Sequence, residues 1–229
     1  MSEIKVVMDP KKRKEYLDFY MKLLGIEVEE DPNCAYCPVS LTSTPEELKP
    51  AVAARQEQLK KILDSAKITT YDPRTSKYSP DMNKDATPQE VFTVDAGKVL
   101  SSRFFSGNNL LPSTGFGTEQ GIALSSNRMA VILMDPAVRI SRMLPSHAIY
   151  LQAANLDAQA ERISQVFTML KEYEPGAGIC DKHPILLGFK GGHHVNLEAE
   201  IYNSFPELKY QYDGNVPIID LHTTRKLNY

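Results

Sequence analysis

Residues 110–123 have the sequence LLPSTGFGTEQGIA, in which an apolar segment runs into a glycine-containing turn and then into a helix. The segment from Phe104 to Leu111 has the composition of a β-strand, and the helix is expected to end near Ser125. Gly115 and Gly117 give the backbone the freedom that a tight turn needs. Parallel α/β sheets are built from strands that lead through such turns into helices, so this stretch indicates the α/β class.

The same alternation of strand and helix continues on both sides of this stretch. Met129 to Met134 is a continuous apolar run, which is typical of a parallel strand covered by helices on both faces. Asp or Thr followed by Pro marks three helix starts, because these residues cap a helix and proline fits its first turn. The predicted helices span about 10–24, 45–65, 88–100 and 157–171, and the further strands 35–41, 68–71, 148–152 and 185–189.

These elements predict a Rossmann-like (flavodoxin-like) parallel sheet with helices on both faces, plus N- and C-terminal extensions. We expect residues 1–30 to form an N-terminal helical extension and residues 31–152 to form the α/β core. Residues 153–229 are expected to add a helix, a strand and a tail that pack on the core. Ligands of such sheets bind at the carboxyl ends of the strands.

The composition of the chain limits the classes of function. Its 229 residues are 42% hydrophobic and 24% charged, as in ordinary globular proteins. A net charge of −3 argues against a nucleic acid polymer as partner. Three cysteines are too few for a disulfide framework, and no apolar run approaches the ~20 residues of a membrane span. We therefore expect a cytoplasmic protein without a membrane partner.

The turn within residues 110–123 is a candidate anion site. Gly115 and Gly117 let backbone N–H groups approach an anion, and the start of the following helix adds a positive dipole end. Ser113 and Thr118 offer hydroxyl groups at the same place. The alternative is a tight strand-to-helix turn whose small residues serve packing alone.

Two carboxylates accompany this turn. Glu119 is expected at the start of the helix, beside the anion, although an acid there also simply complements the helix dipole. Asp95 lies four residues after Val91 and four before Val99, so it shares the apolar face of its helix. A carboxylate on such a face is paired, hydrogen-bonded or functional.

The pattern P-S-x-G-x-G-x-E-x-G-x-A of residues 112–123 resembles the signature of the nucleoside 2-deoxyribosyltransferase superfamily, and most closely its 2′-deoxynucleoside 5′-phosphate N-hydrolases. The resemblance implies that Glu119 attacks the anomeric carbon and forms a glycosyl ester. It also implies that Ser113, Gly115 and Gly117 bind the 5′-phosphate. Asp95 matches an aspartate that positions the sugar and assists protonation of the departing base.

A shorter similarity lies in Ser141 to Leu144, which resembles a family segment whose serine reaches the phosphate site of a neighbouring subunit. It implies that Ser141 binds phosphate in trans and that the protein is a homodimer; a polar loop is the alternative. The resemblance covers about residues 91–145, and more loosely from residue 35. It departs from the family at residues 37–40, where a glycine turn is usual, and at 102–103, where an acidic residue is usual.

The function expected from this resemblance is hydrolysis of the N-glycosidic bond of a (deoxy)nucleoside 5′-monophosphate through a glycosyl-glutamate intermediate. A 2-deoxyribosyltransferase and a nucleotide sensor without turnover remain alternatives.

Tyr71 and Asp72 end the second strand, where they would contact sugar or base, unless Asp72 is an ordinary turn aspartate. His194 and Glu198 share a helical face, but the spacing does not favour a metal, and no cofactor is expected.

Overall fold

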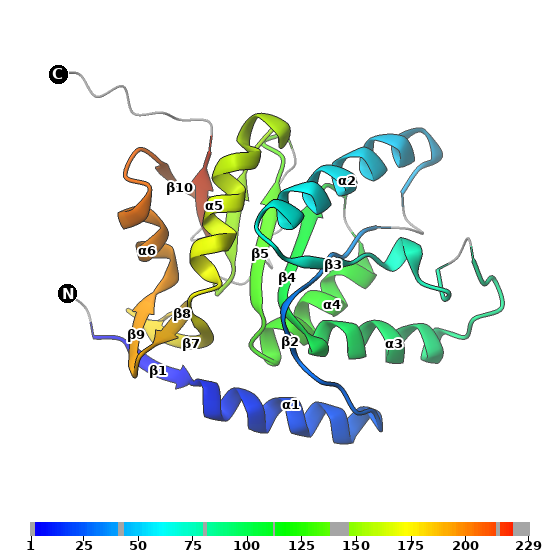
Figure 1. Cartoon of the computed structure of the whole chain (residues 1–229), viewed down its shortest axis with the longest axis horizontal. Coiled ribbons are helices and arrows are strands. Elements are labelled where there is room, and N and C mark those ends of the chain that lie inside the picture. Colours follow the sequence, from blue (N-terminus) through cyan, green and yellow to red (C-terminus); the bar gives the residue numbers. More distant parts are fainter. Residues whose placement is uncertain are drawn as a thin grey trace.

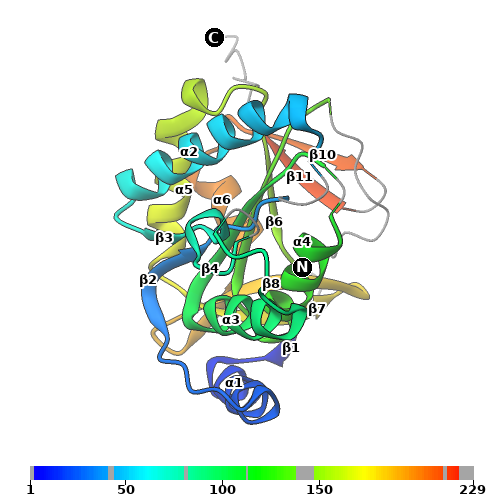
Figure 2. The ribbon, with the colours of Figure 1, turned by 90° about the vertical axis from the view of Figure 1, so that its right-hand side faces the viewer.

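The α/β core predicted from the sequence is built around one large sheet. The structure is a computed structural model that describes residues 3–40, 44–79, 82–111, 113–137, 147–213 and 216–221. Seven strands form the sheet in the order β10-β11-β6-β5-β4-β2-β3, and all are parallel except β10, which pairs antiparallel with β11 (Figures 1 and 2). The strands are β2 (Asp31–Tyr36), β3 (Thr69–Tyr71), β4 (Ser102–Asn109), β5 (Met129–Met134), β6 (Ile149–Gln152), β10 (Lys209–Asp213) and β11 (Val216–Asp220).

Two pairs of helices cover the two faces of this sheet. On one face, α2 (Lys49–Ser65) and α5 (Ala160–Leu170) pack through Leu63 and Phe167 against Phe104 of β4. On the other face, α3 (Pro88–Ser101) and α4 (Thr114–Ser125) pack against neighbouring strand residues. Figure 2 shows α5 and α4 on opposite sides of the strands. The predicted α/β fold with helices on both faces is confirmed.

A second sheet of four antiparallel strands has the order β1-β7-β8-β9. The predicted strand 185–189 belongs to this sheet as β8, so it lies in the C-terminal extension rather than among the parallel strands. The reason is the connection before it: Asp181 and Lys182, with φ of 48° and 69°, form a turn too short for a parallel crossover. The strands are β1 (Lys5–Met8), β7 (Glu174–Cys180), β8 (His183–Lys190) and β9 (His193–Asn196).

Helix α1 (Pro10–Leu24) lies at the lower edge of the molecule in both ribbon views (Figures 1 and 2). It begins at the N-cap Asp9 and ends at Gly25, which has φ of 65°, as predicted. Glu30 accepts ion pairs from Arg13 at 2.6 Å and from the buried Arg128 at 2.7 Å. These contacts tie the N-terminal segment to the core between β4 and β5. The remaining helix, α6 (Leu197–Ser204), packs on the face of α5.

Two local predictions around β2 were wrong. The strand spans Asp31–Tyr36 rather than 35–41, because pairing with β4 ends at Tyr36 and Pro38 has no N–H to continue the ladder. Thr44 does not cap the next helix, since its hydroxyl donates to the carbonyl of Ser40 at 2.6 Å. The helix instead starts with a 3₁₀ turn over Glu46–Leu48 before α2.

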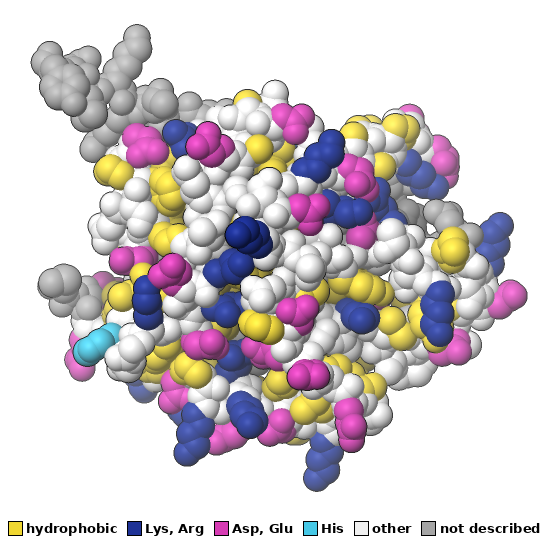
Figure 3. Space-filling view, viewed as in Figure 1, with side chains coloured by type: hydrophobic (Ala, Val, Ile, Leu, Met, Phe, Trp, Pro, Cys, Tyr) yellow, Lys and Arg dark blue, Asp and Glu magenta, His cyan; other side chains and the backbone are white. Residues whose placement is uncertain are grey.

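The surface in Figure 3 shows basic and acidic side chains interspersed over the visible face. This mixture agrees with the small net charge of −3. None of the helices in the described ranges combines the length and the apolar character that crossing a lipid bilayer requires.

Candidate active site

The strand order places a topological switch point between β2 and β4, as in flavodoxin-like sheets. The chain leaves these two neighbouring strands toward opposite faces, which opens a crevice at their carboxyl ends. A cavity of about 460 Å³ lies on the α3/α4 face at this end. Its lining includes five of the predicted site residues, which are Asp95, Ser113, Gly115, Thr118 and Glu119.

Helix α4 begins earlier than predicted, so Gly115 and Gly117 lie in its first turns rather than in a preceding loop. Ser113 is the N-cap: its Oγ accepts the N–H of Phe116 at 3.3 Å, and its carbonyl accepts the N–H of Gly117 at 3.1 Å. The amide of Gly117 is therefore used inside the helix. The first N–H groups of a helix have no partner within it, which leaves those of Thr114 and Gly115 for an anion.

The glycines of the motif are not required by close packing. A Cβ added at Gly115 would meet only Ser113 Oγ at 3.8 Å, and one at Gly117 would meet nothing within 4 Å. A crowded glycine beside this helix is Gly107 of β4, where a Cβ would lie 2.7 Å from the ring of Phe116 and 2.6 Å from Pro38. Gly107 thus lets the start of α4 sit close to the sheet.

Glu119 is half-buried, and its Oε1 accepts a hydrogen bond from Tyr36 Oη at 2.8 Å. Tyr36 is fully buried at the end of β2. Its ring is stacked between Tyr71, at a centroid distance of 5.5 Å, and Phe105, at 6.0 Å. The stack fixes the phenol, and the phenol in turn holds the carboxyl of Glu119. Tyr36 was missed in the sequence, because the predicted strand 35–41 did not place Tyr36 at a strand end.

Burial raises the pKa of both carboxyl groups in the cavity. Burial, opposed by the hydrogen bond from Tyr36 and reinforced by the charge of Asp95, raises the pKa of Glu119 to about 8. Burial raises the pKa of Asp95 to about 6. The pair therefore holds about one proton at neutral pH, which suits a site that needs one acid and one carboxylate.

The other predicted residues either lie apart from the cavity or have their polar groups engaged within the protein. Tyr71 contributes through the stack on Tyr36 and does not line the cavity. Asp72 is buried, and its carboxylate accepts a hydrogen bond from Arg74 Nε at 2.9 Å, which matches the alternative of a turn aspartate. Thr118 lines the cavity, but its Oγ1 donates to the carbonyl of Thr114 at 2.9 Å. Ser141 lies outside the described residues.

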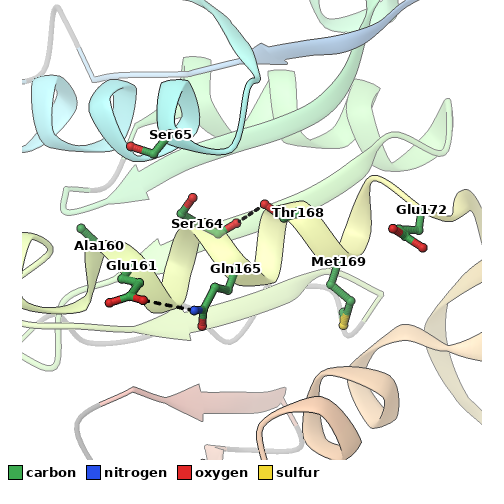
Figure 4. Close-up of a pocket in the computed structure, with 8 residues that line it drawn as sticks. All are labelled: Ser65, Ala160, Glu161, Ser164, Gln165, Thr168, Met169 and Glu172. Carbon is green, nitrogen blue, oxygen red and sulfur yellow. Dashed lines mark hydrogen bonds between the residues drawn. The ribbon is translucent and has the colours of Figure 1, made fainter.

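A larger hollow of about 810 Å³ runs along the outer side of α5 and contains none of the predicted residues (Figure 4). Its polar groups are engaged locally: Thr168 Oγ1 donates to the carbonyl of Ser164, and Gln165 donates to Glu161. We therefore place the candidate site in the cavity between α3 and α4. In the part of the chain that the structure describes, no three His, Cys, Asp or Glu side chains are grouped to hold a metal.

A scan against models of known protein families and a search of curated proteins each find no match to this chain. The similarity to the deoxyribosyltransferase superfamily therefore rests on the motif of residues 112–123 and the residues around it.

Proposed function

We propose that the protein hydrolyses the N-glycosidic bond of a (deoxy)nucleoside 5′-monophosphate, giving a free base and a sugar phosphate. The observation that carries the proposal is the joint placement of Glu119 and Asp95 in one cavity, beside the N-terminus of α4. At about 460 Å³ the cavity is within the usual range for small-molecule sites.

The proposed reaction uses the two carboxyl groups in turn. The carboxylate of Glu119 attacks C1′ as the C1′–N bond breaks, and Asp95 gives its proton to the departing base. Asp95 then takes a proton from water, which attacks C1′ and releases the carboxylate of Glu119. A carboxylate beside C1′ also stabilises the oxocarbenium character of both transition states.

This sequence of steps requires the proton of the pair to be on Asp95 when the substrate reacts. Before substrate binds, the proton resides mainly on Glu119, since burial raises its pKa further than that of Asp95. The positive charge that develops at C1′ favours the ionised form of the adjacent Glu119, as does the hydrogen bond from Tyr36. The opposite assignment, with Asp95 as nucleophile, would place the covalent sugar on Asp95.

The start of α4 is suited to the 5′-phosphate. The amides of Thr114 and Gly115 and the dipole of a twelve-residue helix attract an anion there. Among the described residues that line the cavity there is no Lys or Arg. Phosphate recognition by backbone amides is therefore the simplest arrangement for this chain.

The decisive experiment incubates the protein with deoxynucleosides, deoxynucleoside 5′-monophosphates and their ribose counterparts, with and without a second base. Free base released from monophosphates alone supports the proposal. Products that require the added base would indicate a transferase. Tight nucleotide binding without any product would indicate a sensor.

The contribution of Ser141 from a second subunit makes a homodimer part of the proposal, and sedimentation analysis tests it.

The pH dependence of kcat/KM is expected to be bell-shaped. Activity should rise as pH passes about 6, where the pair loses its first proton, and fall as pH passes about 8, where it loses the second. Initial rates at low substrate concentration between pH 4.5 and pH 9.5, chosen to span these values, measure both limbs. A rate that keeps rising through the upper limb would contradict the need for a protonated partner.

Ser113→Asp is expected to raise KM for a nucleoside monophosphate about tenfold or more, with little loss of stability. Asp caps a helix as well as Ser, but its charge would repel a phosphate at the same place. Thermal unfolding checks that the cap survives. The matching unphosphorylated nucleoside is the control, because it should be affected much less. Equal effects on both substrates would show that the phosphate does not bind at this end of the cavity.

Tyr36→Phe is expected to lower kcat about tenfold, because a hydrogen bond to a charged group contributes about 1.5–3 kcal/mol. The ring stack with Tyr71 and Phe105 is retained in this variant. Without the donor the pKa of Glu119 should rise, so the upper limb of the pH profile should move to higher pH. Tyr20→Phe is the matched control: it removes a hydroxyl that bonds Ser125 Oγ at 2.6 Å, away from the cavity. A profile that does not move would exclude Tyr36 as the positioning residue of Glu119.

A further inference from the structure

The cavity between α3 and α4 has two chemically different sides. The α4 side presents the helix N-terminus and Glu119. The opposite side is formed by the first turns of α3 and by the segment after β3, and it is mainly apolar and aromatic. Its residues are Pro73, Ser76, Tyr78, Ser79, Ala86, Pro88, Val91 and Phe92.

Ser79 stands out on the apolar side. It is only 4% exposed, and its buried Oγ has no hydrogen-bond partner among the residues that the structure describes. The backbone around it is fixed, since its N–H donates to the carbonyl of Ser76 at 2.9 Å and its own carbonyl accepts the N–H of Asn83 at 2.9 Å. Buried hydroxyl groups are rarely left unpaired, and the exceptions call for an explanation such as a ligand. The hydroxyl of Ser76 differs, because it accepts the N–H of Tyr78 at 3.2 Å.

We propose that residues 76–79 and the first turns of α3 form the nucleobase subsite, in which Ser79 Oγ hydrogen-bonds the polar edge of an uncharged base. This inference rests on the proposed function. Apolar and aromatic side chains such as Phe92 suit the faces of a flat heteroaromatic ring. The described lining residues of this side carry no charge, so they suit a neutral base rather than the phosphate. A hydroxyl both donates and accepts, so Ser79 fits either kind of group on a base.

The orientation of α3 and α4 supports placing the base on the α3 side of the cavity. Both α3 and α4 start at the carboxyl end of the sheet and run toward its other end, as the order of strands and helices requires. Asp95 and Glu119 lie at similar depth, seven residues after Pro88 and six after Ser113, or roughly 9–11 Å along each helix. A sugar between these carboxyls, with its phosphate at Ser113, would direct its base to the α3 side, where Ser79 lies.

The test compares two variants with two ligands, each of which carries half of the substrate. Calorimetry measures the binding of free adenine, guanine, cytosine and thymine, and of 2-deoxyribose 5-phosphate, to the full chain. Ser79→Ala should weaken the best-bound base about five- to tenfold, as expected for one hydrogen bond, and leave the sugar phosphate unchanged. Ser113→Asp should weaken binding of the sugar phosphate and leave binding of the base unchanged. The melting temperature of Ser79→Ala should equal or exceed that of the wild type, because the substitution removes an unpaired buried hydroxyl.

The outcomes separate this inference from the proposed function. Undiminished base binding in Ser79→Ala, equal loss of both ligands, or no base binding in the wild type would overturn the subsite. If the wild type releases no base from any nucleotide but the crossed pattern holds, the hydrolase proposal fails and the base subsite stands. If turnover occurs and KM for nucleotides is the same in Ser79→Ala and the wild type, the hydrolase stands and the subsite is wrong.

Discussion

Glu119→Gln is expected to lower kcat at least about a thousandfold, the scale of loss when a covalent nucleophile is removed. The amide keeps the shape of the side chain, and its oxygen still accepts the hydrogen bond from Tyr36. Only the ability to form an ester with C1′ is lost. Base release measured by chromatography under saturating substrate gives the ratio of kcat values. A variant that retains a tenth of wild-type activity would refute the assigned mechanism.

Stability provides the control for this variant, and its sign follows from the pKa. Glu119 has a folded pKa of about 8, above its ordinary value of 4.5, so the folded state holds the proton more tightly than the unfolded state. Ionisation of Glu119 therefore destabilises the fold, and the free energy of unfolding falls as pH rises from about 4.5 to about 8. Glu119→Gln should match the wild type near pH 4.5 and be more stable near pH 8, on the order of 3 kcal/mol after allowance for partial exposure. Denaturant unfolding at the two pH values measures this difference.

The identity of the nucleophile has a direct readout. Acid quench of the wild type during turnover, followed by proteolysis and mass spectrometry, should find the sugar phosphate on the peptide that contains Glu119. A label on the peptide that contains Asp95 would show that the two carboxyls have exchanged roles, in agreement with the higher pKa of Glu119.

Asp95→Asn is expected to lower kcat about 10²- to 10³-fold, the usual contribution of a general acid. The loss should depend on the leaving group. A nucleotide of 7-methylguanine carries a positive charge on its base and departs without protonation, so the variant should lose much less activity toward it. Steady-state rates on guanine and 7-methylguanine nucleotides measure the difference.

The exposed Asp85→Asn, on the segment before α3, controls for the general effect of losing a negative charge. A deficit in Asp95→Asn that is the same for both leaving groups would assign Asp95 to sugar positioning alone. A deficit shared by Asp85→Asn would show that the charge of this surface, rather than proton transfer, governs the rate.

Several elements that depend on local interactions were predicted correctly from the sequence. The capping box of Thr87 and Glu90 starts α3 as predicted, because both hydrogen bonds join residues three positions apart. The apolar run Met129–Met134 is β5, since a strand covered on both faces needs apolar residues at every position. Asp95 and Glu119 were identified as candidate site residues from the spacing on one helix and from one motif.

Tertiary structure decided what depends on distant pairing. The bond from Tyr36 to Glu119 joins residues 83 positions apart, and no local pattern encodes it. The crowding at Gly107 by Pro38 and Phe116 is likewise set by how β4 and α4 pack. The pKa values of the two carboxyls follow from burial, which exists only after the sheet and both helices are assembled. The chain thus specifies helix starts such as that of α3 and its reactive residue types locally, while the strand order that brings these residues into one cavity comes from long-range packing.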